Sequence, residues 1–334
     1  MPVALITPEE MIRTPGPEAD ILREAGFEVR YPANTMFTRG LGTEDESIQV
    51  LSGASALLAG GEHVTAKVLA ALPELRVVAR AGVGFDRVDV PAATKHKVVV
   101  TITPTANHAA VAEHTLALIF GVARSVALND RVLRSGQWIR RTLRPVRGRT
   151  IGLVGLGRIG RSTATRCAAL GMKVIAYELY PDKEFVAKQG IELVDFQTLL
   201  KQSDFVSLHC PLSDDTHGLM NAAAFALMKP DSVFINTARG GLVVESALIA
   251  ALQSGHLGGA GLDVFEQEPT DPGNPLFKMD NVVVCPHLGG GDSQSIADMG
   301  AEAARSIVSL YRGQWPPDAA VLNGTLKEGW RWTC

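Results

Sequence analysis

The fold is decided by the segment Thr150-Ile151-Gly152-Leu153-Val154-Gly155-Leu156-Gly157-Arg158-Ile159-Gly160. It predicts a short buried strand that ends in the pattern G-x-G-x-x-G and continues directly into a helix. In such a turn Gly155 leaves the strand, Gly157 lets the backbone approach a pyrophosphate, and Gly160 lets helix and strand pack closely. The free amides at the start of the helix then face the phosphates. The segment therefore predicts a dinucleotide-binding unit.

The flanking sequence supports this interpretation, which glycines alone would not carry because glycine clusters are common in loops. Residues 161–170 are rich in helix formers and are followed by Gly171, a residue suited to ending a helix. A second strand is predicted over 173–177, and Glu178 stands at its end, where a carboxylate meets the ribose hydroxyls of the adenosine. The alternative is a glycine-rich turn with a surface glutamate.

The composition indicates a globular protein with no preference for a charged macromolecule. The chain has 334 residues, 46% of them hydrophobic, which is enough for a large core and two domains. Its net charge of −3 favours neither nucleic acid nor an anionic membrane as a partner. The N-terminus lacks a basic region, and the longest apolar helical stretch, 115–123, is too short for a bilayer span. We therefore expect a cytoplasmic protein.

The cysteines and histidines predict no metal site. Cys167, Cys210, Cys285 and Cys334 lie far apart and form no C-x-x-C pair, which argues against both zinc and a disulfide framework. The histidines show no H-x-H or H-x-x-x-H spacing.

One local concentration of charge lies between Arg131 and Arg149. Its arginines alternate with apolar residues that include Trp138 and Ile139, and they offer no stacking platform for bases. An apolar centre within a charged rim is typical of a subunit contact. We predict a homo-oligomer that uses this segment, and a solvated arm is the alternative.

Strand-like and helical runs alternate along the chain, which is typical of parallel sheets covered by helices. Because the dinucleotide motif begins only near residue 150, a separate α/β unit must precede it. That unit is predicted to hold strands over 3–6, 27–29, 56–58, 75–78 and 98–100, and helices over 18–25 and 65–72. A bridging helix over 106–126 leads to the second unit, with later strands over 174–177, 191–193, 205–208, 232–236, 261–264 and 282–285. The helical run 293–311 returns to complete the first unit.

Three polar segments follow predicted strands of the second unit. They are Asn236–Gly241, Leu262–Pro269 and Cys285–Gly290. Ligands bind at the carboxyl ends of strands in an open α/β sheet. Arg239, Glu268 and His287 are therefore predicted to converge on one crevice.

These three residues fit the reduction of a 2-keto acid by a nicotinamide. A guanidinium such as that of Arg239 grips a carboxylate bidentately, which an ammonium does poorly. The reaction also needs a proton donor for the carbonyl oxygen as hydride arrives, and histidine, here His287, is the residue type suited to giving that proton and taking it back in reverse. Glu268 would favour the imidazolium and orient the ring. Each residue alone has an ordinary structural explanation, and their coincidence behind the dinucleotide motif favours chemistry.

The four motifs together resemble the signature motifs of the D-2-hydroxyacid dehydrogenases, over about residues 57–310. The resemblance implies an α/β fold with two Rossmann-like doubly wound domains. Residues 1–103 and 291–334 would form a substrate domain, and residues 104–290 would form an NAD-binding domain inserted into it. It also implies NAD as the cofactor, a small 2-hydroxy or 2-keto acid as the substrate, a homodimer, and catalytic roles for Arg239, Glu268 and His287.

The resemblance implies further contacts. The segment Ala81–Gly84 is similar to the loop whose amides hold the substrate carboxylate, so the implied substrate-binding residues are Val83, Gly84, Arg239 and His287. The implied cofactor-binding residues are Val83, Gly155, Gly157, Arg158, Ile159, Gly160, Glu178, Cys210, Pro211, Thr237, Ala238, Asp263 and Gly290.

Two departures from the family pattern bear on the substrate. Where phosphoglycerate dehydrogenases carry an arginine, this chain reads Gly60-Gly61-Glu62-His63, which offers no arginine or lysine and adds an acid. After His287 the family has a small residue and then Ser or Thr, whereas this chain has Gly290-Gly291-Asp292. The sequence therefore favours a small unphosphorylated acid such as glyoxylate or hydroxypyruvate.

Two alternatives stay open at this point. One is 3-phosphoglycerate dehydrogenase of serine biosynthesis. The other is an NAD(H)-sensing binding protein or corepressor, because a fold does not fix a function. Formate dehydrogenases resemble the chain less, since they place Gln where this chain has Glu268.

Overall fold

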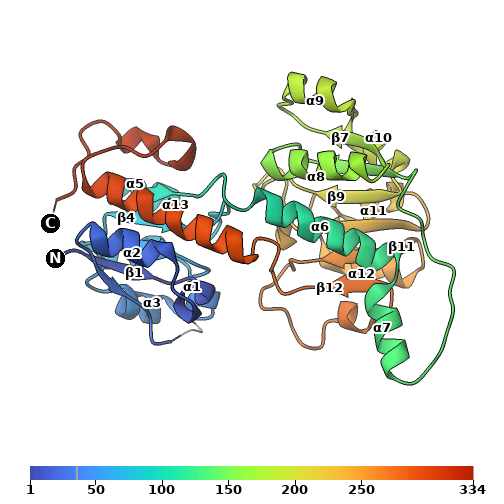
Figure 1. The fold of residues 1–334 in the computed structure, drawn as a ribbon, viewed down its shortest axis with the longest axis horizontal. Coiled ribbons are helices and arrows are strands. Elements are labelled where there is room, and N and C mark those ends of the chain that lie inside the picture. Colours follow the sequence, from blue (N-terminus) through green and yellow to red (C-terminus); the bar gives the residue numbers. More distant parts are fainter. Residues whose placement is uncertain (35–36, 334) are drawn as a thin grey trace. The chain divides into compact units, whose positions relative to one another are not determined.

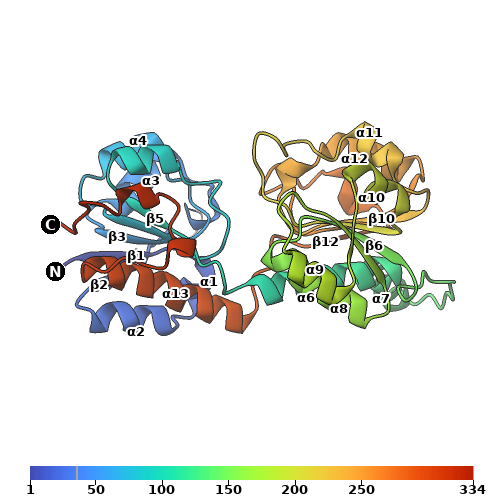
Figure 2. The ribbon, with the colours of Figure 1, turned by 90° about the horizontal axis from the view of Figure 1, so that it is seen from above.

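The computed structural model describes residues 1–34 and 37–333, so Cys334 lies outside the described residues. The chain forms two compact units. The first consists of Met1–Asn107 with Gly291–Cys334, and the second of His108–Gly290. Each unit is a parallel sheet between two layers of helices, and this α/β class is the predicted one (Figures 1 and 2).

The described part of the first unit contains a five-stranded parallel sheet in the order β2-β1-β3-β4-β5. The strands are β1 (Val3–Ile6), β2 (Glu28–Arg30), β3 (Ala56–Ala59), β4 (Val77–Arg80) and β5 (Val99–Thr101). One face packs against α1 (Glu9–Arg13), α2 (Pro17–Glu24) and α13 (Ser293–Tyr311). The other packs against α3 (Glu44–Leu51), α4 (Ala66–Ala71) and α5 (Val90–Lys95), as Figure 2 shows. Because both faces are covered, central strands such as β3 are apolar throughout.

The C-terminal segment packs on this same unit. It contains two short 3₁₀ turns, η4 (Asp318–Ala320) and η5 (Gly324–Leu326), and a third turn of this unit, η1 (Phe37–Arg39), lies before α3. The indole of Trp330 donates to the carbonyl of Lys97 at 2.8 Å. The Trp332 ring meets Phe27 and Tyr311 edge to face. The tryptophans of the tail, whose role the sequence does not indicate, are therefore part of a core.

The described part of the second unit contains a seven-stranded parallel sheet in the order β12-β11-β10-β9-β6-β7-β8. The strands are β6 (Thr150–Val154), β7 (Lys173–Tyr177), β8 (Glu192–Leu193), β9 (Phe205–Leu208), β10 (Ser232–Asn236), β11 (Leu257–Leu262) and β12 (Val282–Val284). The chain reverses its direction of growth between β6 and β9, which is the switch point where Rossmann sheets bind ligands.

Helices cover both faces of this second sheet. One layer holds α6 (His108–Ala123), α8 (Arg158–Ala169) and α9 (Lys183–Gln189). The other holds α10 (Phe196–Gln202), α11 (Ala222–Leu227) and α12 (Glu245–Gln253), as Figure 2 shows. Two 3₁₀ turns, η2 (Gly240–Leu242) and η3 (Pro275–Lys278), follow β10 and precede β12.

Two predicted elements differ from the structure. The predicted bridging helix over 106–126 is α6, which ends at Ala123. A helix that was not predicted, α7 (Val126–Arg134), begins after Ser125, whose φ is +49°. The predicted strand 261–264 is β11, which begins at Leu257 and ends at Leu262. Its sequence LGGAGL hides it, because glycines lack β propensity. They are required there: a Cβ on Gly261 would lie 2.9 Å from the Cβ of Leu118 in α6.

No single helix among the described residues is long and apolar enough to cross a membrane. By length and composition alone the bent pair α6 and α7 passes the same test, with an angle of 57° between its helices.

Candidate active site

The glycine loop lies between β6 and α8, and each of its glycines has a different steric reason. Gly155 has φ +98°, and a Cβ there would come within 2.7 Å of the Cys210 backbone nitrogen. A Cβ on Gly160 would lie 2.3 Å from the carbonyl oxygen of Gly155. A Cβ on Gly157 would meet nothing within 4 Å, and this residue is the N-cap of α8. The loop is therefore packed against the segment after β9 at Gly155 and against its own backbone at Gly160, whereas a side chain at Gly157 would meet no neighbour.

Glu178 lies beside this loop. Its carboxylate accepts the amide of Leu156 at 2.7 Å and the amide of Tyr180 at 2.9 Å. The acid at the end of β7 is therefore held next to the open Gly157 backbone, at the position predicted for a ribose contact. Arg158 and Ile159 form the first turn of α8, with Arg158 exposed.

The segment after β9, which contains His209 and Cys210, packs against the glycine loop at Gly155. His209 Nε2 lies 3.0 Å from Ser207 Oγ, and burial lowers the pKa of His209 to about 4. The ring is therefore neutral at pH 7. Cys210 is half-buried, and burial raises the pKa of its thiol to about 11, so it is no thiolate nucleophile. Pro211 follows it and is exposed.

Arg239 follows β10 and is held by a buried asparagine. Asn236 Nδ2 donates to the Arg239 carbonyl at 2.9 Å, and Asn236 Oδ1 accepts the Ala238 amide at 3.0 Å. The neighbouring Thr237 is buried, and its Oγ1 lies 2.9 Å from Oγ1 of Thr115 in α6. The loop that carries Arg239 is therefore fixed from within.

This loop touches the one that carries Glu268. A Cβ on Gly240 would lie 1.7 Å from the carbonyl oxygen of Phe265, so only glycine permits the contact. Glu268 folds back, and its Oε1 accepts the amide of Phe265 at 3.1 Å.

Glu268 also meets the histidine of the third loop. Its Oε2 lies 2.8 Å from Nδ1 of His287. The imidazole is 48% exposed, so its other nitrogen can reach a ligand. His287 has φ +57°, a left-handed conformation that a histidine adopts at a cost and that persists only where neighbours enforce it. The structure therefore brings Arg239, Glu268 and His287 to one edge of the second sheet, although their roles stay predictions.

Asp263 is the neighbour that enforces the His287 backbone. The carbonyl of Asp263 accepts the His287 amide at 2.8 Å. Its carboxylate accepts the amides of Leu288 and Gly289, each at 2.7 Å. Gly290 follows as the last residue of the second unit and is half-buried.

Asp263, His114 and Cys285 are the one set in the described chain whose ligand atoms lie close enough together for a metal, within 4.8 Å of one another. Both Asp263 oxygens already accept backbone amides, and His114 Nε2 lies 3.2 Å from Oδ1. The set is therefore explained as a buried ion pair beside a thiol. Cys167, Cys210 and Cys285 are free.

Val83 and Gly84, the other predicted contacts, belong to the first unit. They lie in the loop after β4 and are half-buried. Gly82, with φ +131°, donates its amide to Thr103 Oγ1 at 2.8 Å. Arg80 Nε donates to the Gly84 carbonyl at 3.0 Å. The loop is thus anchored at both ends.

The acid of the loop 60–63 does not face outward, and the expectation that it adds an acid to the substrate side is wrong. Glu62 is buried: Thr7 Oγ1 donates to its Oε1 at 2.5 Å, and the Gly60 amide donates to its Oε2 at 3.0 Å. Burial raises the pKa of Glu62. Its side chain joins β1 to β3 instead.

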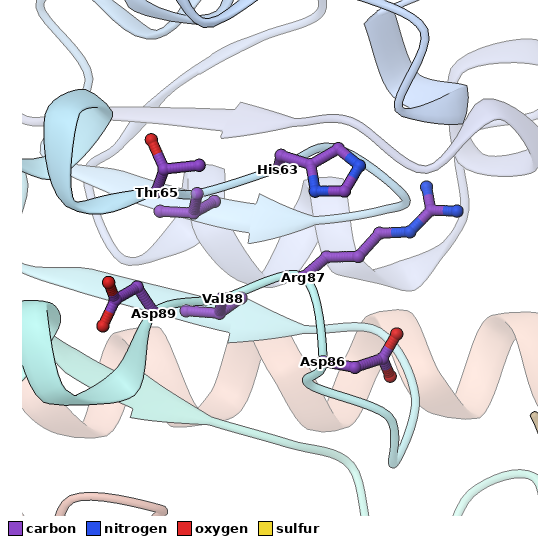
Figure 3. Close-up of a pocket in the computed structure, with 7 residues that line it drawn as sticks. His63, Thr65, Asp86, Arg87, Val88 and Asp89 are labelled. Atoms are coloured by element: carbon purple, nitrogen blue, oxygen red, sulfur yellow. The ribbon is translucent and has the colours of Figure 1, made fainter. Parts of the chain in front are cut away.

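A surface hollow of about 200 Å³ lies beside this loop (Figure 3). Figure 3 shows the His63 and Arg87 side chains extending in the same direction, away from Thr65 and Asp89. Arg87 Nη1 donates to the carbonyls of Gly61 and Arg39. Burial lowers the pKa of His63, with the Arg87 charge adding to the effect. None of the predicted site residues lines this hollow.

Two residues that organise the site were missed by sequence reasoning, Asn236 and His114. Asn236 lies at the end of the predicted strand, three residues before Arg239. An asparagine at a buried position so close to a candidate functional residue indicates that its amide holds the backbone of that residue. His114 lies three residues after buried Val111 and four before buried Leu118, so helical spacing places it on the inward face.

Fold and site together define a dinucleotide-binding α/β protein with an arginine, a carboxylate and a histidine at the strand ends. Residues 116–289 match the family model described as D-isomer specific 2-hydroxyacid dehydrogenase, NAD binding domain. The chain belongs to the D-isomer specific 2-hydroxyacid dehydrogenase family.

Individual relatives agree with this assignment. The chain is 46% identical to D-3-phosphoglycerate dehydrogenase of Mycobacterium leprae over 275 residues, which are 81% of this chain and 52% of that protein. It is 42% identical to glyoxylate reductase of Thermofilum pendens, over 77% of this chain and 78% of that protein. A protein from Thermus thermophilus superimposes with a TM-score of 0.85 at 34% identity, over 96% of this chain and 99% of that one. The chain spans about half the length of the phosphoglycerate dehydrogenases that it matches.

Proposed function

We propose that the protein is an NAD-dependent oxidoreductase that interconverts a D-2-hydroxy acid and its 2-keto acid by hydride transfer. The observation that carries the proposal is the 2.8 Å contact between His287 Nδ1 and Glu268 Oε2, at the same sheet edge as the Arg239 loop and the glycine loop. A proton donor, its orienting carboxylate and an anion-binding guanidinium are the groups that this reaction needs.

The second unit fits a nicotinamide dinucleotide. The open Gly157 backbone at the start of α8 suits a pyrophosphate, and Glu178 beside it suits ribose hydroxyls. When bound, the nicotinamide supplies or accepts the hydride. Gly155, Gly157, Arg158, Ile159 and Gly160 would hold the phosphates. Cys210 and Pro211 would lie near the adenosine, and Thr237, Ala238, Asp263 and Gly290 near the nicotinamide half, with Val83 from the first unit.

The residues of the chain divide the remaining work. In reduction Arg239 binds the substrate carboxylate, and His287 gives its Nε2 proton to the carbonyl oxygen while Glu268 keeps Nδ1 bonded and the ring in place. In oxidation neutral His287 takes the hydroxyl proton. Val83 and Gly84 would bind the substrate carboxylate through their amides.

Steady-state kinetics with a panel of 2-keto acids and NADH test this proposal. His287→Ala should lower kcat by about 10²–10⁴ with NADH binding retained. Arg239→Lys should lose most of the activity because the bidentate fork is gone. His96→Gln, at an exposed site in the first unit, serves as the control. Unaltered turnover by His287→Ala would refute the assignment. NADH binding without turnover of any keto acid would favour a nucleotide sensor.

We propose a small unphosphorylated substrate such as glyoxylate or hydroxypyruvate. A phosphate dianion needs cations, and each charge-assisted hydrogen bond contributes roughly 1.5–3 kcal/mol. The loop 60–63 supplies no cation, because burial favours the neutral form of its His63. The neighbouring Arg87 already donates through Nη1 to the carbonyls of Gly61 and Arg39.

The second candidate is 3-phosphoglycerate dehydrogenase, and two observations favour it. Glu62 is turned inward, so it does not repel a phosphate, and the Arg87 guanidinium lies against the same loop. The ratio of kcat/KM for hydroxypyruvate to that for phosphohydroxypyruvate separates the candidates. A tenfold or larger preference for the phosphorylated acid would overturn the first candidate.

We further propose that the segment from Arg131 to Arg149 joins two copies of the chain into a homodimer. Helix α7 buries none of its residues within the unit, and Trp138 is 83% exposed. Arg131 and Arg144 are tied to Asp280 and Asp231, so the charges are partly paired while the apolar residues between them are left uncovered.

A further inference from the structure

The segment that carries His287 is held by a single residue, Asp263. Three successive amides, those of His287, Leu288 and Gly289, donate to its carbonyl and its carboxylate. The left-handed backbone of His287 needs such support. The direction of the imidazole toward Glu268 therefore depends on the state of the Asp263 carboxylate.

The Asp263 side chain is only 1% exposed, so its charge has to be compensated inside the protein. His114 of α6 provides the nearest cation, with Nε2 at 3.2 Å from Oδ1. Nε2 is buried, and this 3.2 Å contact is its nearest ion-pair contact in the described chain, although its angle is not that of a regular hydrogen bond. The Asp263 contact, and to a smaller extent Cys285, raises the pKa of His114 to about 10. Against the effect of burial, His114 and the two amides lower the pKa of Asp263.

Asp263 and His114 pack tightly against the segment 287–289. A Cβ on Gly289 would lie 2.9 Å from Asp263 Oδ2 and 3.7 Å from Cδ2 of the His114 ring. The groups facing His114 are Asp263 after β11 and Cys285 after β12. Glu113, the adjacent acid on α6, is bonded to Arg166 of α8 instead, at 3.3 Å.

We propose that His114 is a positioning residue: its imidazolium keeps the buried Asp263 carboxylate charged and thereby fixes the segment 287–289 that aims His287. This inference rests on the proposed function for its effect on turnover. Its structural part concerns residues of the second unit alone and needs no substrate.

The structural part is tested with His114→Gln, which removes the cation, and His114→Lys, which keeps one. Because the folded-state pKa of His114 is raised from 6.5 to about 10, its stabilisation is complete below about pH 6 and is lost as pH rises through 10. The gap in Tm between the wild type and His114→Gln should therefore be widest near pH 6 and close by pH 10. The Tm of His114→Lys should lie closer to that of the wild type than the Tm of His114→Gln does, over pH 6–9.

Hydrogen exchange gives a local readout of the same idea. In His114→Gln the amides of Leu288 and Gly289 should exchange faster than in the wild type. The difference should grow as pH falls, since Asp263 without its cation takes up a proton at higher pH. The control His96→Gln should match the wild type. A Tm gap independent of pH together with unchanged exchange at 288–289 would overturn the proposal.

Kinetics measure the functional part. His114→Gln should lower kcat by about 10- to 100-fold, the effect of a small misplacement of a reacting group. The Kd for NADH should change by a smaller factor, because most of the proposed cofactor contacts lie at the glycine loop and Glu178. His114→Lys should recover part of the loss. If the wild type reduces no 2-keto acid, the proposed function fails, while the Tm and exchange results still decide the role of His114. Wild-type kcat in His114→Gln would contradict the positioning role.

Discussion

Gly240→Ala tests whether the contact between two loops sets the geometry of the candidate active site. The added Cβ would lie 1.7 Å from the carbonyl oxygen of Phe265, 2.0 Å from its carbon and 2.6 Å from the nitrogen of Glu266. These are backbone atoms, so no flexible side chain can turn away. Gly240 has no positive φ, so the substitution adds bulk without the strain of a left-handed backbone.

The size of the effect follows from these distances. Restoring an ordinary contact requires the loops to separate by more than 1 Å, because real Cβ atoms essentially never lie under 3.0 Å from a neighbour. Overpacking of this kind costs about 1–3 kcal/mol of stability. For a domain of this size, about 2 kcal/mol corresponds to roughly 4–8 °C in Tm. Arg239 directly precedes Gly240, and Glu268 follows Glu266 by two residues in the loop that would be displaced. A shift of about 1 Å should therefore lower kcat by roughly 10²-fold.

The assay combines Tm, the Kd for NADH and kcat with the best keto acid of the panel. NADH affinity should change by a smaller factor than kcat, because most of the proposed cofactor contacts lie at the glycine loop and Glu178. Gly324→Ala is the matched control, since its Cβ would meet nothing within 4 Å and its φ is ordinary. A Gly240→Ala protein with the Tm and kcat of the wild type would refute the view that this contact aligns Arg239 with Glu268.

Three further predictions concern the cofactor, the proton and the subunit contact. Glu178→Ala should raise the kcat/KM for NADPH relative to NADH by roughly tenfold, because a like charge near the 2′-phosphate is removed, and an equal preference already in the wild type would contradict this. Glu268→Gln should move the acid limb of the oxidation pH–rate profile, and the alkaline fall in the reduction direction, to lower pH, since the imidazolium of His287 loses its partner at 2.8 Å. An unmoved profile would show that Glu268 does not act on His287. Trp138→Ser should weaken self-association at least tenfold in sedimentation, as expected for an exposed aromatic anchor, whereas a wild type that is monomeric at micromolar concentration would remove the basis for the dimer.

Much of the fold could be predicted because its strands are buried and locally encoded. Strands β1, β9 and β10 and helix α13 have the predicted bounds, since their apolar runs and flanking polar residues mark both ends. Strand β11 could not be placed correctly, because its glycines are chosen by the approach of Leu118 in α6, a contact between segments more than a hundred residues apart. Helix α7, which follows the left-handed Ser125, was not predicted either.

The sequence by itself determined the dinucleotide motif and the family, and it selected Arg239, Glu268 and His287 as candidate site residues, because those depend on residue type at fixed spacing. The tertiary structure alone decided which groups surround them. It turned Glu62 into the core, where Thr7 and the Gly60 amide bind it, and it placed His114 next to Asp263 from a distant helix. The direction of a side chain and the partner of a buried charge depend on packing between segments remote in the chain, and local sequence does not encode that packing.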